Sequence, residues 1–306
     1  MIVDVHYHFG ISPNIENTAK AMAQILSTDF IRLGVYKPFK EVVASYKDSL
    51  DDSDGDKLIQ RMDESGIDIS VLLNVDYLDW GMDDSALLHQ HNESARVVAR
   101  HPERLIALAG VDPRRPKASS LLRRCIEEFN MKGLKWHPDF GFYPNSEESY
   151  EVLKVLNEFE LPLLTHCSPL SFTRAKYAHP IYLDDIALDF PNIRIIAAHS
   201  GMMWWHDWMA LAQLKPNISG DLAMWQMIAE SKPLLFRRHL REILDTIGSE
   251  QLLFATDGPY TEAYVSNKRY VDMIKDLTIE NSDGIVFDQE EVDAILGGNA
   301  ARVFNL

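Results

Sequence analysis

Short apolar runs alternate with stretches of helical periodicity along most of the chain. Most of these runs are continuous rather than alternating, which is typical of strands buried on both faces of a parallel sheet. The predicted strands are residues 1–10, 67–75, 105–111, 133–136, 161–165, 193–198, 217–220 and 252–256. Strands that alternate with helices in this way predict a closed (β/α)8 TIM barrel, with a doubly wound open sheet as the alternative.

Helical periodicity fills the segments between these runs and the end of the chain. The predicted helices are residues 57–66, 85–100, 118–129, 147–160, 181–190, 204–214, 234–247, 264–277 and 289–304. No G-x-G-x-x-G fingerprint follows any strand, so a dinucleotide site has no support. The length of 306 residues suits one barrel domain that spans residues 1–306.

Residues 11–56 interrupt the alternation directly after the first strand. This segment contains a helical patch at residues 19–26, prolines at 13 and 38, and an acidic run at residues 48–56. We interpret it as an insertion or lid, because long connections of this kind often cover an active site.

The charge balance limits the partners of the protein. Asp and Glu number 46 against 30 Lys and Arg, for a net charge of −16. A nucleic acid or an anionic membrane needs a basic face, so we expect a small-molecule substrate instead. The two cysteines, Cys125 and Cys167, form no C-x-x-C pair. This pattern, with no apolar run long enough to cross a bilayer and no leader-like start, favours a cytoplasmic protein.

Polar residues capable of chemistry follow the predicted strands. His6 and His8 lie two positions apart in a strand, so their imidazoles share a face and offer half of a tetrahedral metal site. Taken alone, the pair could equally be structural. Further candidates stand at or just past other strand ends: Lys135, His137, His166, His199 and Asp257. In a barrel these ends surround one mouth, which is where barrel enzymes place their active sites.

These residue types suit a divalent transition metal, namely zinc, manganese, iron or cobalt. A metal-bound water becomes a nucleophile near neutral pH. Asp257 could both bind the metal and take the proton of that water, while His199 polarises a substrate carbonyl or holds the nucleophile. Lys135 could bind a substrate carboxylate, bridge a second metal if carbamylated, or form a salt bridge behind the ligands.

Two further residues are candidate substrate contacts. His137 follows a strand end immediately before Pro138, and the alternative is a purely structural role. Trp204 opens a stretch with several tryptophans that could line an aromatic pocket. Packing of apolar bulk against the barrel is the more ordinary interpretation of that spacing.

Six motifs, taken in order, resemble the amidohydrolase superfamily. They lie at residues 4–8, 133–138, 163–166, 198–201, 254–257 and 298–304. The chain is most similar to the amidohydrolase-related branch, which includes aminocarboxymuconate-semialdehyde decarboxylase, resorcylate-type decarboxylases, and lactone and other hydrolases. One departure is Thr256-Asp257-Gly258-Pro259, where the family often has Ser-Asp-Tyr-Pro.

The resemblance implies a ligand set and two possible activities. His6, His8, His166 and Asp257 would bind one divalent ion, usually zinc, and His199 would act on the metal-bound water or the substrate. The first expectation is a hydrolase of a small, carboxylated cyclic (lactone) or amide substrate. The alternative is a non-oxidative decarboxylase of an aromatic or muconate-like acid. A non-catalytic scaffold is disfavoured because none of the expected metal ligands is missing. Proteins of this family are commonly dimers, so the resemblance also implies a homodimer.

Overall fold

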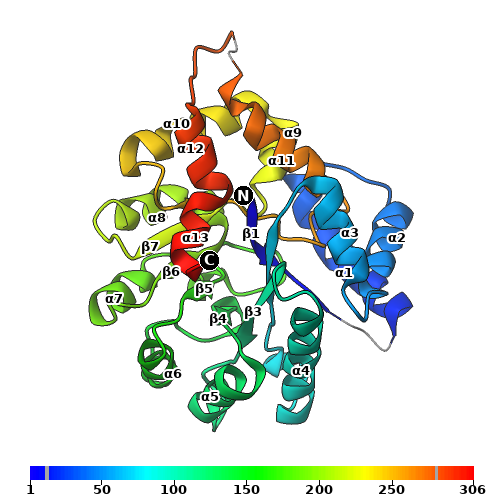
Figure 1. The fold of residues 1–306 in the computed structure, drawn as a ribbon, viewed down its shortest axis with the longest axis vertical. Helices are drawn as coiled ribbons and strands as arrows, with labels where there is room; N and C mark the ends of the chain where they lie inside the picture. The colour runs from blue at the N-terminus through cyan, green and yellow to red at the C-terminus, as the bar shows by residue number, and fades with distance from the viewer. Residues whose placement is uncertain (11–13, 280–281) are drawn as a thin grey trace.

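The computed structural model describes residues 1–10, 14–279 and 282–306. Within them, parallel strands pair in the order β1-β2-β3-β4-β5-β6-β7-β8, which confirms the predicted barrel (Figure 1). The strands are β1 (Val3–Tyr7), β2 (Ile69–Leu73), β3 (Leu105–Gly110), β4 (Leu134–Trp136), β5 (Leu163–Thr165), β6 (Ile195–Ala197), β7 (Ile218–Asp221) and β8 (Leu252–Leu253). Each predicted strand is present; seven are shorter than predicted, and β7 has the predicted length but lies one residue later in the chain.

The first strand meets the segment after the last strand and closes the barrel. The Val5 N–H donates to the Phe254 carbonyl at 3.2 Å, and the Asp257 N–H donates to the His6 carbonyl at 2.9 Å. The buried Asp4 carboxylate also spans this junction, accepting bonds from the Thr256 backbone at 2.9 Å and from its hydroxyl at 2.6 Å. These bonds exclude the open-sheet alternative.

Helices surround the strands, as expected from the βα alternation. Their bounds are α3 (Asp56–Ser65), α4 (Asp84–Arg100), α5 (Ala118–Phe129), α6 (Glu147–Glu158), α7 (Tyr182–Asp189), α8 (Trp205–Ala212), α9 (Trp225–Ser231), α10 (Pro233–Ile247), α11 (Asn267–Lys275), α12 (Gln289–Asp293) and α13 (Asn299–Phe304). Short 3-10 helices are η1 (Leu78–Trp80), η2 (Pro138–Phe140), η3 (Ala175–Tyr177) and η5 (Asp276–Thr278), and a π-helical turn, η6 (Ala294–Gly298), joins α12 to α13. The segment η4 (Ala198–Trp204) is not a regular helix, because the four residues 199–202 within it have positive φ.

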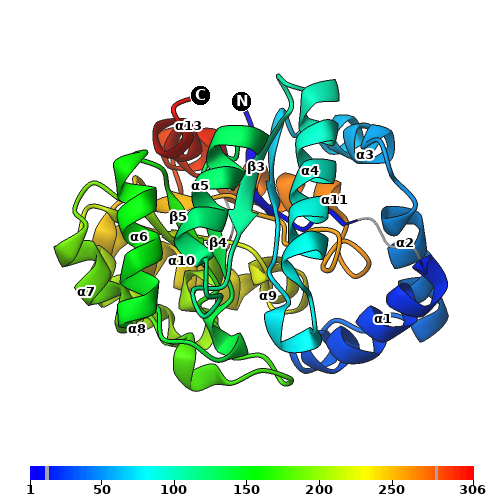
Figure 2. The same cartoon turned by 90° about the horizontal axis from the view of Figure 1, so that it is seen from below.

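The segment after β1 forms two helices. The predicted patch at residues 19–26 belongs to the longer α1 (Ile15–Arg32), and α2 (Phe39–Leu50) was not predicted. Residues 11–13, at the start of the predicted insertion, lie outside the described residues. Figure 2 shows α1 and α2 at the end of the barrel opposite the two chain termini, which is the end where the strands finish.

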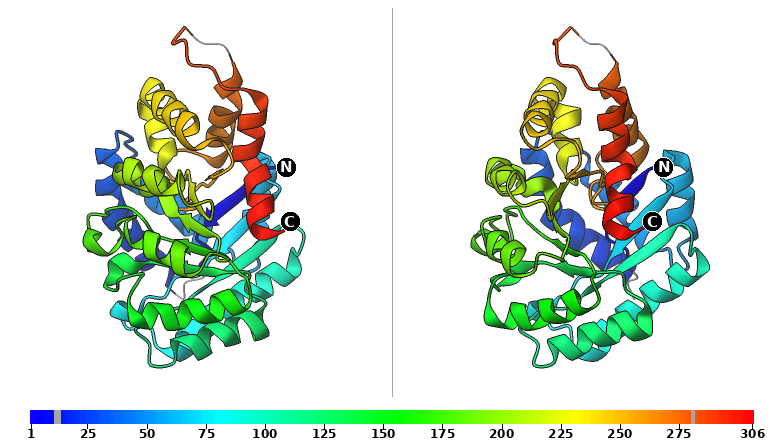
Figure 3. Two further views of the ribbon diagram at one scale, coloured as in Figure 1. Left: turned by 90° about the vertical axis from the view of Figure 1, so that its left-hand side faces the viewer. Right: turned by 60° about the vertical axis from the view of Figure 1, so that its left-hand side comes forward.

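The core has two parts. The larger cluster includes residues of the strands and of the surrounding helices, and the smaller one combines strand residues such as Val5, Val71 and Leu164 with Ala300 and Val303 of α13. Helix α13 packs against β1 and β8, so the chain termini lie side by side (Figure 3). None of the helices described is both long and apolar enough for a bilayer crossing.

One buried histidine links α4 to the barrel. His91 is fully buried; its Nδ1 lies 2.7 Å from the Leu87 carbonyl, and its Nε2 accepts the Gly110 N–H at 2.9 Å. Burial lowers the pKa of His91 to about 4 from the ordinary 6.5. Below pH 6.5 the unfolded chain therefore takes up a proton that the folded chain refuses, and stability falls as the pH drops toward 4.

We expect His91→Gln to remove this acid sensitivity, because an amide can make the same two bonds without titrating. When the pH is lowered from 7 to 5, the free energy of unfolding, measured with urea, should fall by about 2 kcal/mol more in the parent than in the variant. The control is His89→Gln, which changes an exposed residue of the same helix. An equal pH dependence in the parent and His91→Gln would contradict the assignment.

Candidate active site

Three donor atoms converge where β1 meets the segment after β8. The Nε2 atoms of His6 and His8 lie 3.1 Å apart, and Asp257 Oδ1 lies 3.3 and 3.2 Å from them. All three side chains are buried. The i, i+2 spacing of the histidines thus brings both imidazoles to one point, as predicted.

The spacing of these atoms fits a metal ion. Ligand bonds of about 2.0–2.2 Å in a tetrahedral site place the donor atoms roughly 3.3 Å from one another. Two imidazole nitrogens and a carboxylate oxygen are donors that zinc, manganese and iron accept. Among the described residues, this trio is one of three groups whose donor atoms lie close enough to share an ion.

Asp221, at the end of β7, fixes the tautomer of His6. Its Oδ2 lies 2.9 Å from His6 Nδ1 and accepts a hydrogen bond from the N–H there. The lone pair on His6 Nε2 is then free to point at His8 and Asp257. Asp221 was not among the predicted site residues, because the predicted strand ended at Gly220. The signal was nevertheless present, since an acidic residue directly follows the strand as at the other site positions.

His199 has a left-handed backbone conformation, which residues other than glycine rarely adopt. Its φ is +61°, and Ser200 follows at +46°. Such strain persists only where the surroundings hold it. Here Asp221 Oδ1 accepts the His199 N–H at 2.7 Å, and Trp225 Nε1 donates to the His199 carbonyl at 2.8 Å. Asp221 therefore positions both His6 and His199.

His166 lies beside His199 rather than within the cluster of three. His199 Nδ1 lies 3.2 Å from the Ala223 carbonyl, and its Nε2 lies 3.1 Å from His166 Nδ1. His166 Nε2 lies 2.9 Å from the Ser168 carbonyl and 3.2 Å from the Ser168 hydroxyl. Both ring nitrogens of His166 are thus engaged, and its place as a fourth ligand stays a prediction.

A buried carboxylate that the sequence analysis did not single out supports two of the histidines. Asp139 Oδ1 lies 3.0 Å from His137 Nδ1, and its Oδ2 lies 3.8 Å from His166 Nε2. The His137 and His166 rings stack with centroids 4.5 Å apart. These three residues form another group whose donor atoms could share an ion. The two imidazoles hold the pKa of Asp139 well below its usual range although burial opposes them.

Lys135 lies next to His6 and is 1% exposed. Its Nζ lies 3.3 Å from His6 Nε2. Burial lowers its pKa to about 8, although the carboxylates of Asp221, Asp257 and Asp139 oppose that shift. Lys135 is absent from the described lining of the cavity above the cluster, so a direct substrate contact stays a prediction.

Burial also keeps the imidazoles neutral. It lowers the pKa of His6, His8 and His199 well below the usual value, and that of His137 to about 4 and His166 to about 3. Neutral imidazole is the form that binds a metal. Burial raises the pKa of Asp257 to about 6, against the influence of His199 and Lys135.

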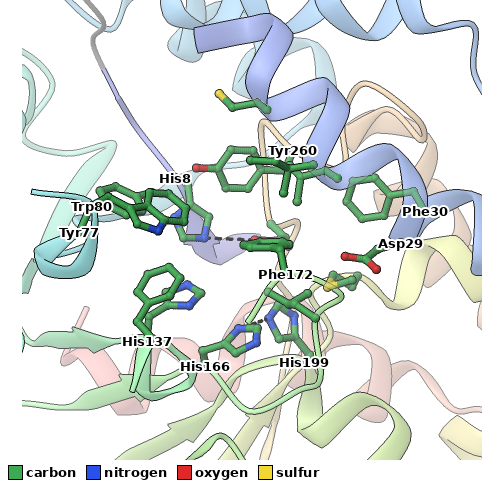
Figure 4. A pocket seen from close by; sticks show the side chains of 17 residues that line it. His8, Asp29, Phe30, Tyr77, Trp80, His137, His166, Phe172, His199 and Tyr260 are labelled. Carbon is green, nitrogen blue, oxygen red and sulfur yellow. Dashed lines mark hydrogen bonds and ion pairs between the residues drawn. The ribbon is translucent and has the colours of Figure 1, made fainter. Parts of the chain in front are cut away.

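A cavity of about 120 Å³ opens over these residues (Figure 4). Its described lining comprises His8, His137, His166, His199, Asp29, Asp257, Met22, Ile25, Leu26, Phe30, Tyr77, Trp80, Phe140, Leu170, Phe172, Met224 and Tyr260. A second cavity of about 550 Å³ shares six of these residues, namely His8, Met22, Ile25, Tyr77, Trp80 and Tyr260. The walls are therefore mostly aromatic and aliphatic, and α1 supplies one side.

The predicted aromatic contact, Trp204, lies elsewhere. It is half-buried against His179, with ring centroids 4.9 Å apart, and is not among the described lining residues. Its neighbour Trp208 is fully buried and bonds the Ser219 carbonyl, as a packing residue does. The aromatic rings of the cavity come instead from α1, η1 and the residue before it, η2, and the loops after β5 and β8.

A comparison with protein-family models shows to which family the chain belongs. The family model described as "Amidohydrolase" matches residues 44–306, which is most of the chain. The chain belongs to the amidohydrolase family. For this amidohydrolase, the comparison confirms the relationship that the six motifs predicted. No curated protein matches it.

Solved structures share the fold of this amidohydrolase at low sequence identity. An uncharacterised TIM-barrel protein, Bb4693 from Bordetella bronchiseptica, is 14% identical with a TM-score of 0.74, covering 99% of this chain and 98% of that one. The 5-carboxyvanillate decarboxylase of Novosphingobium aromaticivorans, complexed with manganese and 4-hydroxy-3-methoxy-5-nitrobenzoic acid, is 18% identical with a TM-score of 0.70, covering 100% and 96%. The 2,6-dihydroxybenzoate decarboxylase from Rhizobium is 18% identical with a TM-score of 0.68, covering 99% and 98%.

Proposed function

We propose that this amidohydrolase is a divalent-metal-dependent, non-oxidative decarboxylase of a small aromatic acid. The observation that carries the proposal is the cavity, whose aromatic and aliphatic walls open directly on His8, His199 and Asp257. This cavity of about 120 Å³ shares walls with the neighbouring one of about 550 Å³, so the space leaves room for a substituted aromatic ring. The structural similarity to two decarboxylases of aromatic acids supports this activity over hydrolysis.

The walls suit the loss of carbon dioxide. A carboxylate bound among apolar groups loses its hydration, whereas carbon dioxide is neutral and needs none. The bond between the ring carbon and the carboxyl carbon breaks, its electron pair stays on the ring, and the ring carbon then takes a proton. Asp257 and His199 both line the cavity, so either can hold that proton.

His6, His8 and Asp257 would hold the ion, and His166 remains the proposed fourth ligand. Manganese in one of the similar structures supports a divalent transition metal here. When bound, such an ion withdraws electrons from the carboxylate and phenol oxygens of the substrate and orients them. His137 and the aromatic side chains would position the ring, and the α1 part of the insertion would cover it.

The test separates carbon dioxide loss from hydrolysis. Protein loaded with Mn²⁺ is incubated with a panel of hydroxybenzoates, vanillate-type acids, lactones and amides. We expect carbon dioxide release from an aromatic acid, with one deuteron on the vacated ring carbon when the solvent is D₂O. A chelator should stop turnover, and added Mn²⁺ should restore it.

Solvent ¹⁸O gives the contrary outcome. Entry of ¹⁸O into the product of a lactone or amide, with no carbon dioxide from any acid, would replace the proposal with metal-dependent hydrolysis. Turnover that a chelator leaves unchanged would contradict the metal assignment. The cytoplasmic location and the homodimer that the sequence analysis anticipates stay predictions.

A further inference from the structure

The cavity has an unusual charge pattern for a site that takes an acid. No lysine or arginine is present among its described lining residues, and its two carboxylates are Asp257 and Asp29. Asp257 belongs to the metal-binding cluster, whereas Asp29 comes from α1. Asp29 therefore places a second acidic group in the wall that covers the strand ends.

Asp29 is held in place through one of its oxygens. Its Oδ2 accepts the backbone N–H of Ser171 at 3.3 Å and the Ser171 hydroxyl at 3.1 Å. These bonds join α1 to the loop after β5. A carboxylate offers about four acceptor positions on its two oxygens, so Oδ1 keeps its capacity for another donor.

Asp29 is half-buried, and a ring bound in the cavity would cover it further. Phe30 and Phe172 line the cavity together with Asp29 (Figure 4). A bound ring that displaced water from Asp29 without offering a donor would leave the carboxylate poorly solvated. A hydroxyl or ammonium group on that ring would instead form a charge-assisted hydrogen bond.

We propose that Asp29 is a specificity-determining residue that selects aromatic acids bearing a hydrogen-bond donor on the side facing α1. This inference rests on the proposed function, because it assumes that the carboxylate of the acid lies at the metal. A second negative group at that side is excluded by repulsion from Asp29. The substrate class is thus narrowed to acids with a hydroxyl or ammonium substituent remote from the carboxylate.

The test compares matched ligands on the Mn²⁺-loaded protein by calorimetry. One pair is 2,4-dihydroxybenzoate and 4-methoxysalicylate, and a second pair carries the same groups meta to the carboxylate. A third pair, 4-(aminomethyl)salicylate and 4-ethylsalicylate, distinguishes an ammonium from a hydroxyl. We expect the donor-bearing member of at least one pair to bind about tenfold more tightly or better.

Two variants separate recognition from the α1 contact. Asp29→Asn keeps the size and an acceptor for Ser171 but loses the charge, and it should reduce the preference to about threefold or less. Ser171→Ala removes the hydroxyl contact and keeps the carboxylate, so the preference should persist. A preference lost in Ser171→Ala would show that the contact between α1 and Ser171, rather than the charge of Asp29, determines which ligand binds more tightly.

Equal binding of both members of every pair by the parent protein would overturn this inference and leave the proposed function standing. An unchanged preference in Asp29→Asn would overturn it as well. If the parent bound no member of any pair, both this inference and the proposed function would fail.

Discussion

Asp257→Asn is expected to lower the affinity for Mn²⁺ or Zn²⁺ by roughly 10³-fold or more and to abolish turnover. The loss of groups that merely orient ligands typically costs 10–100-fold, and the loss of a ligand charge costs more. Asp257 is the one anionic donor in the trio with His6 and His8, at 3.3 and 3.2 Å from their Nε2 atoms. Elemental analysis of the purified protein measures the metal content, and competition with a chelator measures the affinity.

The matched control for this variant is Asp207→Asn, which removes a carboxylate that is 57% exposed on α8. It should keep the full metal content of the parent. Metal that stays bound in Asp257→Asn at the parent's affinity would show that the ion lies elsewhere. The neighbouring group of His137, Asp139 and His166 would then be the place to look.

Asp221→Asn is expected to lower metal affinity by about 10–100-fold through the tautomer of His6. Asparagine keeps one oxygen for the N–H groups of His199 and Ala223, which Asp221 Oδ1 now accepts at 2.7 and 3.1 Å. Its amide then faces His6 Nδ1 with a donor. His6 must accept there and carry its proton on Nε2, which removes the lone pair that a metal needs.

Nitrogen NMR of labelled histidine reports this change directly. In the metal-free parent the His6 proton should sit on Nδ1, and in Asp221→Asn it should move to Nε2. Because the backbone bonds are kept, the unfolding free energy should change by no more than about 2 kcal/mol. An unchanged tautomer with unchanged metal affinity would refute the role assigned to Asp221.

The barrel and most residues of the candidate site could be predicted because they have strong local signals. Strands buried on both faces form apolar runs, and a histidine or aspartate that ends such a run is conspicuous. His6, His8 and Asp257 were found in this way. Their convergence depends on closure of the barrel, which the alternation of strands and helices also predicts.

Other features depend on packing between distant segments. The strand that ends at Asp221 is short and has a glycine before its last residue, so the predicted strand stopped one residue too early, at Gly220. The positive φ of His199 depends on partners at Asp221 and Trp225, more than twenty residues away. The position of Trp204 depends on where η4 ends. Asp29 lies in the cavity wall because α1 extends beyond the predicted residues 19–26.

The junction between the first and last strands has a consequence for how the protein is made. Two of the three donor atoms lie at the start of the chain, and the third arrives only when the segment after β8 has been synthesised and docked beside β1. A nascent chain therefore offers two imidazoles without their carboxylate, and full affinity for the ion comes only after closure. An ion bound by this trio would join β1 to the segment after β8, so metal occupancy would report that the barrel has closed.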